Sequence, residues 1–241
     1  MDRIFKIHCS AIGEIMGQVG LTEKQKLRLF ELATREKALT DLMQLEYDTL
    51  MFKRDNPELP ETAKTFLQNW YANDQEQIHS KFIDKGNQVE IELIEFMADQ
   101  LGYGLAEKNL ESIEDDYFIG TCDVILQDKI VDVKASWNRK TLQQNVLEPI
   151  DRNYSYQGQG YMHLYKKDKF VLFYGLMNTP EDVNFGYEVI YDKMPDKDRC
   201  IAYELSFDKE FIDSVIERVK MCREYLIEYD KLVKSKLGKI N

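Results

Sequence analysis

The first third of the chain shows the three-to-four-residue spacing of apolar positions that predicts amphipathic helices. One helix is expected over residues 22–52, where Thr22 and Gln25 form the pattern of an N-terminal capping box. Asn56-Pro57 ends this helix, because proline lacks an amide hydrogen and constrains the residue before it. A second helix is expected over residues 61–80, with its aromatic side chains in the core.

The middle and the end of the chain favour strands. Residues 118–126 and 130–135 are rich in β-branched and apolar side chains, and the polar segment 127–129 between them has the composition of a turn. These segments predict an antiparallel hairpin. Two further strands are expected at residues 186–191 and 200–206.

A long helix is predicted over residues 208–237. Its apolar side chains recur at alternating steps of three and four residues, which gives one continuous apolar face. This face either packs against the rest of the chain or joins copies of the chain in an oligomer. Its members are Ile212, Val215, Val219, Cys222, Leu226, Tyr229 and Val233.

The predicted hairpin contains charges that a half-buried sheet normally excludes. If its turn consists of Asp128-Lys129, then Asp123 lies opposite Lys134. Because side chains alternate between the two faces of a sheet, Asp132 shares a face with Lys134, and three charges converge. A turn one residue longer or shorter would move Asp123 to the other face.

Two half-buried carboxylates repel each other and lose hydration, and one lysine offsets this cost only in part. A divalent cation would offset it better, and ligation by oxygen alone favours Mg²⁺ or Mn²⁺. Lys134 would then orient or activate an attacking water, or stabilise negative charge that develops on a phosphate. The alternative is a structural pair of aspartate and lysine at a sheet edge, which is common and contributes little.

A third acid lies on the predicted helix before the hairpin. The apolar side chains that follow Glu90 fall three, four, seven and eleven residues after it, so Glu90 is expected to point inward with them. The alternative is that Glu90 belongs to the first turn of its helix and interacts with the helix dipole. The four apolar positions are Leu93, Ile94, Met97 and Leu101.

Composition limits the classes of protein that fit. The 241 residues can bury a sizeable core, and no apolar run reaches the length of a membrane span, so a cytoplasmic location is expected. A net charge of −11 argues against a generally basic DNA-coating protein, although an enzyme that neutralises its carboxylates with metal can be acidic. The four cysteines are Cys9, Cys122, Cys200 and Cys222, and they form no Cys-x-x-Cys pair, which argues against an iron-sulfur cluster. Cys122 and Cys222 are expected to be buried.

The order of these acids resembles that of a known family. A helix glutamate, a strand aspartate and then Asp-x-Lys characterise the PD-(D/E)xK nuclease superfamily, and the chain is similar to it at Gly86-x-x-x-Glu90, Gly120-Thr-Cys-Asp123 and Asp132-Val-Lys134. Gln157-Gly-Gln-Gly-Tyr161 resembles the Gln-x-x-x-Tyr motif of its RecB-like and lambda-exonuclease-like branch, the YqaJ-type phage exonucleases. On a helix, this glutamine and tyrosine would share one face and could reach the active site or the DNA backbone. The alternative is a loop, because two glycines disfavour a helix.

The N-terminal segment also resembles the start of phage-type exonucleases of this branch, in which a serine and nearby basic residues hold a DNA phosphate. Ser10 and Arg3 match those positions. On the same analogy Thr121, together with Arg139 or Lys140, gives weaker candidates for phosphate contact. Alternatively, Ser10 caps the helix that follows it.

The resemblance implies a restriction-endonuclease-like α/β fold, in which helices flank a mixed β-sheet. It implies a single nuclease domain over residues 1–241, with a helical insertion at 21–80, a catalytic core at 82–207 and a C-terminal helix at 208–237. Asp123 and Asp132 would hold one or two Mg²⁺ or Mn²⁺ ions, with Val133 as a further ligand and Glu90 as a ligand or a water-mediated partner. Lys134 would position the attacking hydroxide.

The activity that the resemblance implies is a metal-dependent DNA exonuclease of phage-type recombination or repair. The expected partners are double-stranded DNA with a free end, a single-strand annealing protein, and further copies of the chain in a trimeric ring; no membrane and no iron-sulfur cluster are expected. Two alternatives stay open. One is a structure-specific or restriction-type endonuclease, and the other is a DNA-binding or phage-host interaction protein on an inactive nuclease fold.

Overall fold

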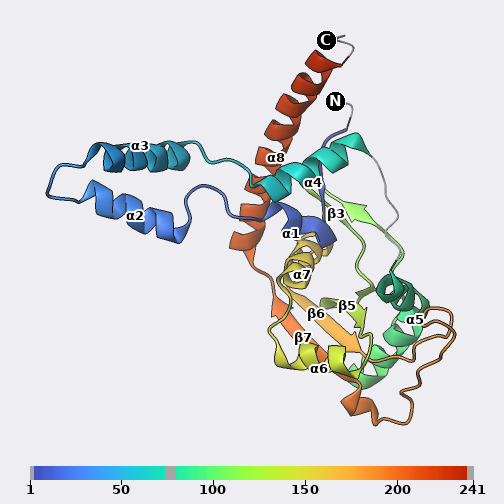
Figure 1. Cartoon of the computed structure of the whole chain (residues 1–241). Helices are drawn as coiled ribbons and strands as arrows, with labels where there is room; N and C mark the ends of the chain where they lie inside the picture. The colour runs from blue at the N-terminus through green and yellow to red at the C-terminus, as the bar shows by residue number, and fades with distance from the viewer. Residues whose placement is uncertain (1–2, 74–79, 238–241) are drawn as a thin grey trace. The chain divides into compact units, whose positions relative to one another are not determined.

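The computed structural model describes residues 3–73 and 80–237 (Figure 1). These residues form two compact units. We call the unit that contains residues 6–13 and 80–216 the sheet unit, and the unit that contains residues 3–5, 14–73 and 217–237 the helical unit. The division into an insertion, a catalytic core and a terminal helix stays a prediction.

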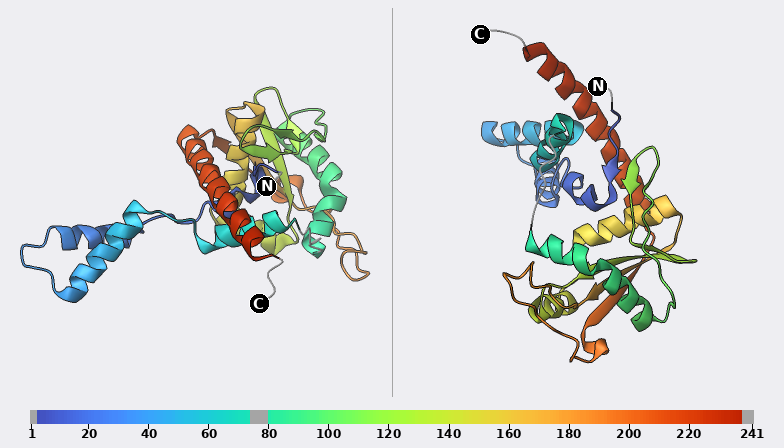
Figure 2. Two further views of the ribbon diagram at one scale, coloured as in Figure 1. Left: turned by 90° about the horizontal axis from the view of Figure 1, so that it is seen from above. Right: turned by 90° about the vertical axis from the view of Figure 1, so that its right-hand side faces the viewer.

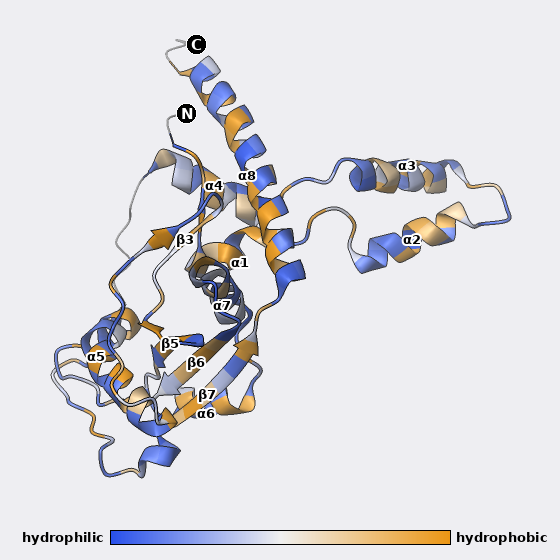
Figure 3. Cartoon of the chain, turned by 180° about the vertical axis from the view of Figure 1, so that it is seen from behind, coloured by the Kyte–Doolittle hydropathy of each residue, from blue (hydrophilic) through white to orange (hydrophobic). Residues whose placement is uncertain are grey.

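A four-stranded mixed sheet forms the centre of the sheet unit. Its order is β4 (Val124–Ile125), β5 (Lys129–Ala135), β6 (Lys169–Gly175) and β7 (Cys200–Ser206); β5 and β6 run parallel, and the outer pairs are antiparallel. The inner strand β6 is apolar and buried on both faces, as is usual for strands covered on both sides. The outer strand β7 alternates between half-buried and exposed residues from Ile201 to Ser206, and both orange and blue bands are visible along it in Figure 3.

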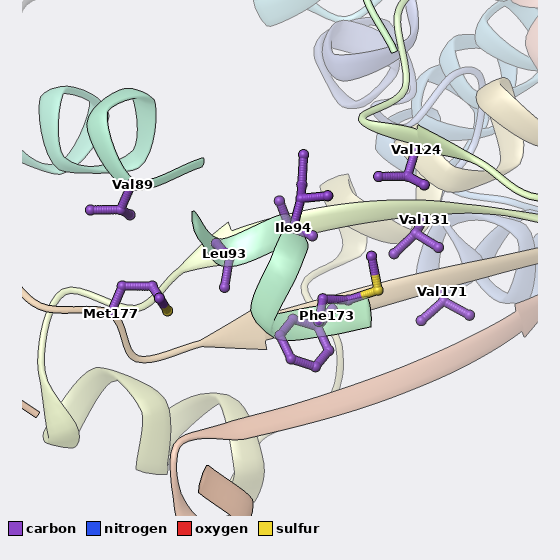
Figure 4. Close-up of a cluster of buried hydrophobic side chains, with 10 residues drawn as sticks. Val89, Leu93, Ile94, Val124, Val131, Val171, Phe173 and Met177 are labelled. Carbon is purple, nitrogen blue, oxygen red and sulfur yellow. The ribbon is translucent and has the colours of Figure 1, made fainter. Parts of the chain in front are cut away.

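Two helices cover this sheet on opposite faces, in all three views of Figures 1 and 2. Helix α5 (Lys81–Leu101) packs its apolar stripe on β4, β5 and β6 (Figure 4). Helix α7 (Arg152–Tyr165) covers the other face. The main core cluster between α5 and the sheet consists of Val89, Leu93, Ile94, Met97, Val124, Val131, Val133, Val171, Phe173 and Met177.

A second, smaller sheet of the sheet unit lies against α7. It has the order β1 (Ile7–His8), β3 (Phe118–Gly120) and β2 (Ile113–Glu114), with β1 and β3 parallel. The remaining short elements are the 3₁₀ helices Cys9–Ala11 and Asp196–Asp198, and the helices α1 (Ile12–Ile15) and α6 (Arg139–Leu147).

The hairpin differs from the sequence prediction in two respects. The predicted strand over residues 118–126 is divided, because β3 joins the small sheet and only β4 pairs with β5. The turn consists of Gln127 and Asp128, so Val124 lies opposite Val131, and the predicted register is wrong by two residues. A shift of two residues preserves the faces, so Asp123 still lies on the same face as Asp132. Its neighbour on the opposite strand is now Asp132 instead of Lys134.

The helical unit contains α2 (Glu23–Ala33), α3 (Asp41–Asp55) and α4 (Glu61–Ala72). The capping box at Thr22 is confirmed, and α3 ends just before Asn56-Pro57 as predicted. A single helix over residues 22–52 is wrong, because the chain leaves the helix after α2 and Thr40 starts a new one by accepting a hydrogen bond from the Met43 amide. The end of the predicted helix 61–80 falls partly on residues 74–79, which lie outside the described residues.

Helix α8 (Lys209–Lys236) and strand β7 confirm the predictions for the end of the chain. The apolar face of α8 is buried at Ile212, Val215, Val219, Cys222 and Leu226. The predicted strand at 186–191 is wrong. Residues 185 and 186 have positive φ angles, and one bridge between Val189 and Thr179 is all the strand pairing that the structure describes there. None of the helices described at residues 3–73 and 80–237 is long and apolar enough to span a membrane.

Candidate functional site

Asp123, Asp132 and Lys134 meet where β4 and β5 begin to separate. The ammonium of Lys134 lies 2.5 Å from Asp132 Oδ2. Asp123 Oδ2 accepts a hydrogen bond of 2.7 Å from the amide of Val133, so a carboxylate replaces the next backbone bond of the ladder. The alternation of side chains therefore predicted the shared face, whereas the direct neighbour of Asp123 had to be seen in the structure.

The two carboxylates are held in a poorly hydrated place. Asp132 is 1% exposed, and its Oδ2 atom has the ion pair with Lys134 but no hydrogen bond of good geometry. Burial raises the pKa of Asp123 to about 7, and repulsion from Asp132 adds to this effect. Attraction to Lys134 and the hydrogen bond from Val133 act in the opposite direction but are weaker. The negative charge of this pair is therefore only partly compensated by the groups around it.

Lys134 is a stable cation in this setting. Burial lowers its pKa, but the attraction of Asp132 and Asp123 is stronger and holds the pKa above its usual value. Its Nζ atom also lies 5.2 Å from the ring centre of Tyr154 on α7, at a distance suited to a cation-π interaction. Lys134 is thus charged at neutral pH, which suits it to orient a polar group or to stabilise an anion.

Helix α5 brings Glu90 to the same place. Glu90 follows the first residue of α5, Lys81, by nine positions, so it does not belong to the first helical turn and the helix-dipole alternative is wrong. Its carboxylate forms an ion pair with Lys108, a contact that the sequence did not predict. Lys108 is held there because the next residue, Asn109, donates backbone and side-chain hydrogen bonds to the carbonyls of Asp123 and Cys122 at 2.7 and 3.0 Å.

A cavity of about 470 Å³ is lined by five of the seven predicted catalytic and metal-ligating residues. Helix α5, strand β5, helix α7 and the N-terminal 3₁₀ turn all contribute to its wall. Asp132 lies behind this wall, in contact with Lys134. The lining residues with polar side chains that matter here are Ser10, Glu90, Asp123, Lys134, Tyr154 and Gln157.

The Gln-x-x-x-Tyr segment lies within helix α7, so the loop alternative is wrong. Gln157 lines the cavity and donates a hydrogen bond of 2.9 Å to the hydroxyl of Tyr161, which is buried behind it. The two glycines allow α7 to approach its neighbours: a Cβ on Gly158 would lie 2.3 Å from the ring of Phe170, and one on Gly160 would lie 2.9 Å from the sulfur of Cys9. Close packing thus outweighs the helix propensity of glycine here.

The weaker phosphate candidates fall in different places. Ser10 lines the cavity inside the short 3₁₀ turn, where it bonds the ring of His8 at 2.8 Å and does not cap a helix. Arg3 belongs to the helical unit, where its guanidinium donates to Asn73 and to the Trp70 carbonyl. Three others lie outside the cavity lining: Thr121 is half-buried after β3, and Arg139 and Lys140 are exposed at the start of α6.

The donor set fits a hard divalent cation through two of its acids. Asp123 and Asp132 supply oxygen ligands whose charge is poorly compensated, which is the environment that such an ion stabilises. Glu90 would join them only after release from Lys108; in the described part of the chain, no three His, Cys, Asp or Glu side chains converge closely enough to surround an ion. The cysteines are free thiols, and Cys122 and Cys222 are buried as predicted.

Two side chains that contact the predicted residues, Tyr154 and Lys108, differ in how far the sequence could have indicated them. Tyr154 precedes Gln157 by three residues, so the helical period alone places it on the same face of α7. Lys108 lies in a loop without periodicity, and its position depends on the bonds of Asn109. No sequence pattern could have found it.

Comparison with known proteins places the fold. No protein-family model and no curated protein matches the chain significantly. Among solved structures, a phage-related exonuclease from Haemophilus somnus 129PT is similar with a TM-score of 0.69 and 21% identity, covering 97% of each chain. An alkaline exonuclease from Laribacter hongkongensis has a TM-score of 0.55 and 13% identity, covering 98% of this chain and 96% of its own. The fold expected from the sequence resemblance is confirmed: this chain has the fold of phage-related and alkaline exonucleases.

Proposed function

We propose that the protein is a metal-dependent exonuclease that hydrolyses phosphodiester bonds of linear DNA. The observation that carries this proposal is the pair of Asp123 and Asp132 with Lys134, on a fold shared with exonucleases. Asp132 is buried with an unsatisfied oxygen, and Asp123 and Lys134 line the cavity in front of it. A solved complex of the Laribacter hongkongensis enzyme with dAMP, with a TM-score of 0.54, adds a nucleotide ligand on the same fold.

The residues of the cavity divide the work of the reaction. Asp123 and Asp132 would hold one or two Mg²⁺ or Mn²⁺ ions, with Glu90 and the backbone of Val133 completing the set. Such ions supply an activated water and neutralise charge on the phosphate. Lys134 holds its proton and stabilises the developing negative charge, while Gln157, fixed by Tyr161, orients the DNA backbone or the water from the wall of the cavity.

The substrate contacts and partners belong to the same proposal. Ser10, which lines the cavity, would hold a phosphate there, and Thr121, Arg139 and Lys140, which lie outside its lining, would contact DNA further from the scissile bond. Arg3 of the helical unit would also contact a DNA phosphate. Duplex DNA with a free end is the proposed substrate. A cytoplasmic setting, a single-strand annealing protein as recombination partner, and a trimeric ring that retains DNA by topology are the corresponding biological proposals.

Digestion of end-labelled linear duplex beside a closed circle tests the function. With Mg²⁺ or Mn²⁺, nucleotides should be released from the linear DNA, the circle should stay intact, and EDTA should stop the reaction. Asp132→Asn and Lys134→Ala should each lower the rate about 10²- to 10³-fold, as the removal of a charge-stabilising group from an active site typically does, with unchanged circular dichroism. Cleavage of the circle would indicate an endonuclease, and metal-independent DNA binding without cleavage would indicate an inactive nuclease fold.

A further inference from the structure

Three aromatic rings and a lysine gather on the sheet unit without a role in the site described above. Phe82 on the first turn of α5 is 57% exposed, and Phe185 in the segment between β6 and β7 is 85% exposed. Trp137, just after β5, is half-buried and meets the ring of Phe82 edge to face at 5.2 Å. The ammonium of Lys81 lies 4.8 to 5.9 Å from the centres of all three rings.

The base of this cluster is held rigidly. Lys85, one turn after Lys81 on α5, is buried and donates hydrogen bonds of 2.9 and 3.0 Å to the carbonyls of Ser136 and Trp137. These bonds fix the backbone of Trp137 to the helix that carries Phe82. The edge-to-face contact then sets the two rings beside each other, where a flat ligand can meet them.

The cluster is continuous with the acid-lysine cavity. Phe82 lies in the wall of the same cavity as Asp123 and Lys134, next to Ile83 and Gly86 from the same helix. A DNA strand whose phosphate reaches Lys134 and which leaves the cavity past Phe82 would bring a neighbouring base to the rings. Exposed rings beside a cation suit an unpaired nucleotide, because the base offers a flat π face and the backbone offers negative charge.

We propose that Phe82, Trp137, Phe185 and Lys81 form a stacking platform for an unpaired base of the DNA strand whose phosphate occupies the acid-lysine cavity. The proposal rests on the proposed function for its ligand class. It goes further in assigning a single-strand-specific subsite that recognises bases without sequence readout. Paired bases inside a duplex have no free face, so the platform would engage the strand only where it has been opened.

Tryptophan fluorescence tests the contact directly. The chain has two tryptophans, so Trp70→Phe leaves Trp137 as the sole reporter. In the Asp132→Asn background, which prevents digestion, an oligothymidylate should quench this emission. An oligonucleotide of the same length with abasic sugars should quench it at concentrations about tenfold higher. Equal quenching by both, or none by either, would overturn the platform.

Affinity measurements supply the second test. Phe82→Ala and Trp137→Ala should each weaken binding of the oligothymidylate about tenfold, which corresponds to about 1.4 kcal/mol. Phe82→Leu keeps the apolar bulk without a π face and should weaken binding to a similar degree. Tyr187→Ala is the matched control, since Tyr187 is 74% exposed in the same segment as Phe185 and has no ring contact that the structure describes.

The two proposals can fail separately. Base-dependent quenching by a protein that never cleaves DNA would refute the exonuclease and keep the platform. Cleavage of linear DNA by an enzyme whose Phe82 and Trp137 variants bind oligothymidylate as tightly as the Tyr187 control would refute the platform and keep the exonuclease.

Discussion

At the scale of single residues, the site is defined by charge that the protein alone does not balance. Asp123 and Asp132 are forced together by the ladder of β4 and β5, while Lys134 compensates only part of their charge. The strain of this arrangement is electrostatic, so it should be visible in the stability of the metal-free protein.

The first prediction concerns the pH dependence of that stability. The pKa of Asp123 is about 7 in the folded protein, against an ordinary value of 3.8, because burial disfavours its charged form. The folded state therefore binds the proton more tightly, so stability from this group is present below about pH 4 and is lost as the pH rises through 7. In EDTA, Asp123→Asn should remove part of this loss and exceed the wild type by at least about 1 kcal/mol at pH 8. Urea unfolding at pH 5 and pH 8 measures the difference in the free energy of unfolding between the variant and the wild type. An equal difference at both pH values would contradict the prediction.

The second prediction concerns the ion pair of Lys108 with Glu90. Because this lysine is paired with the Glu90 carboxylate, it competes with a metal ion for that carboxylate. Lys108→Ala should therefore tighten Mn²⁺ binding in the absence of DNA by up to about fivefold, since a partly exposed ion pair contributes up to about 1 kcal/mol. Titration calorimetry measures the affinity, with the exposed Lys193→Ala as control. Weaker binding by the Lys108 variant would show that the lysine supports the metal site.

At the scale of elements, helix α7 packs closely against its neighbours because two of its residues are glycines, which have no side chain. Gly158→Ala should destabilise the protein by about 1–3 kcal/mol, because its Cβ would lie 2.3 Å from the buried ring of Phe170. Gly86→Ala is the same change inside a helix with nothing within 4 Å of the new Cβ, and should stabilise by about 0.5–1 kcal/mol. Denaturant unfolding of both variants checks the opposite signs. A stabilised Gly158 variant would mean that α7 can move away from β6.

Elements also show where sequence reasoning succeeds and where it stops. Local periodicity identified α8, β7 and the shared face of Asp123 and Asp132, because a period of two or 3.6 fixes which side chains lie together. It could not give the register of the hairpin, because a turn at Asp128-Lys129 and the observed turn at Gln127-Asp128 put the same side chains on each face. Lys108 and Phe185 lie in segments without periodicity, so the contact of Lys108 with Glu90 and that of Phe185 with Lys81 follow from tertiary structure alone.

At the scale of the whole molecule, the net charge of −11 limits how DNA can be held. The cations grouped around the cavity and the platform are Lys81, Lys108 and Lys134. A short oligonucleotide that does not reach Arg3, Arg139 or Lys140 would therefore make about three phosphate contacts. Because each contact to single-stranded DNA contributes a slope of about −0.7, the logarithm of the binding constant should fall with the logarithm of salt with a slope of about −2.

This salt dependence can be measured with the Asp132→Asn protein and an oligothymidylate between 50 and 300 mM salt, conditions in which screening of this kind is readily resolved. Lys81→Ala should reduce the slope by about 0.7, while Lys193→Ala should leave it unchanged. A slope steeper than about −5 would mean that a much larger basic surface contacts the strand.

Helix α5 carries Lys81 and Phe82 at its start, Lys85 in its second turn and Glu90 further on. Phe82 and Glu90 are eight residues apart on this rigid rod, which corresponds to about 12 Å along the helix axis. The helix therefore sets a fixed spacing: a base bound at Phe82 determines which phosphate of the strand lies near Glu90. The point of cleavage would then be measured from the captured base in helical turns, and inserting or deleting one turn of α5 would change the length of the product.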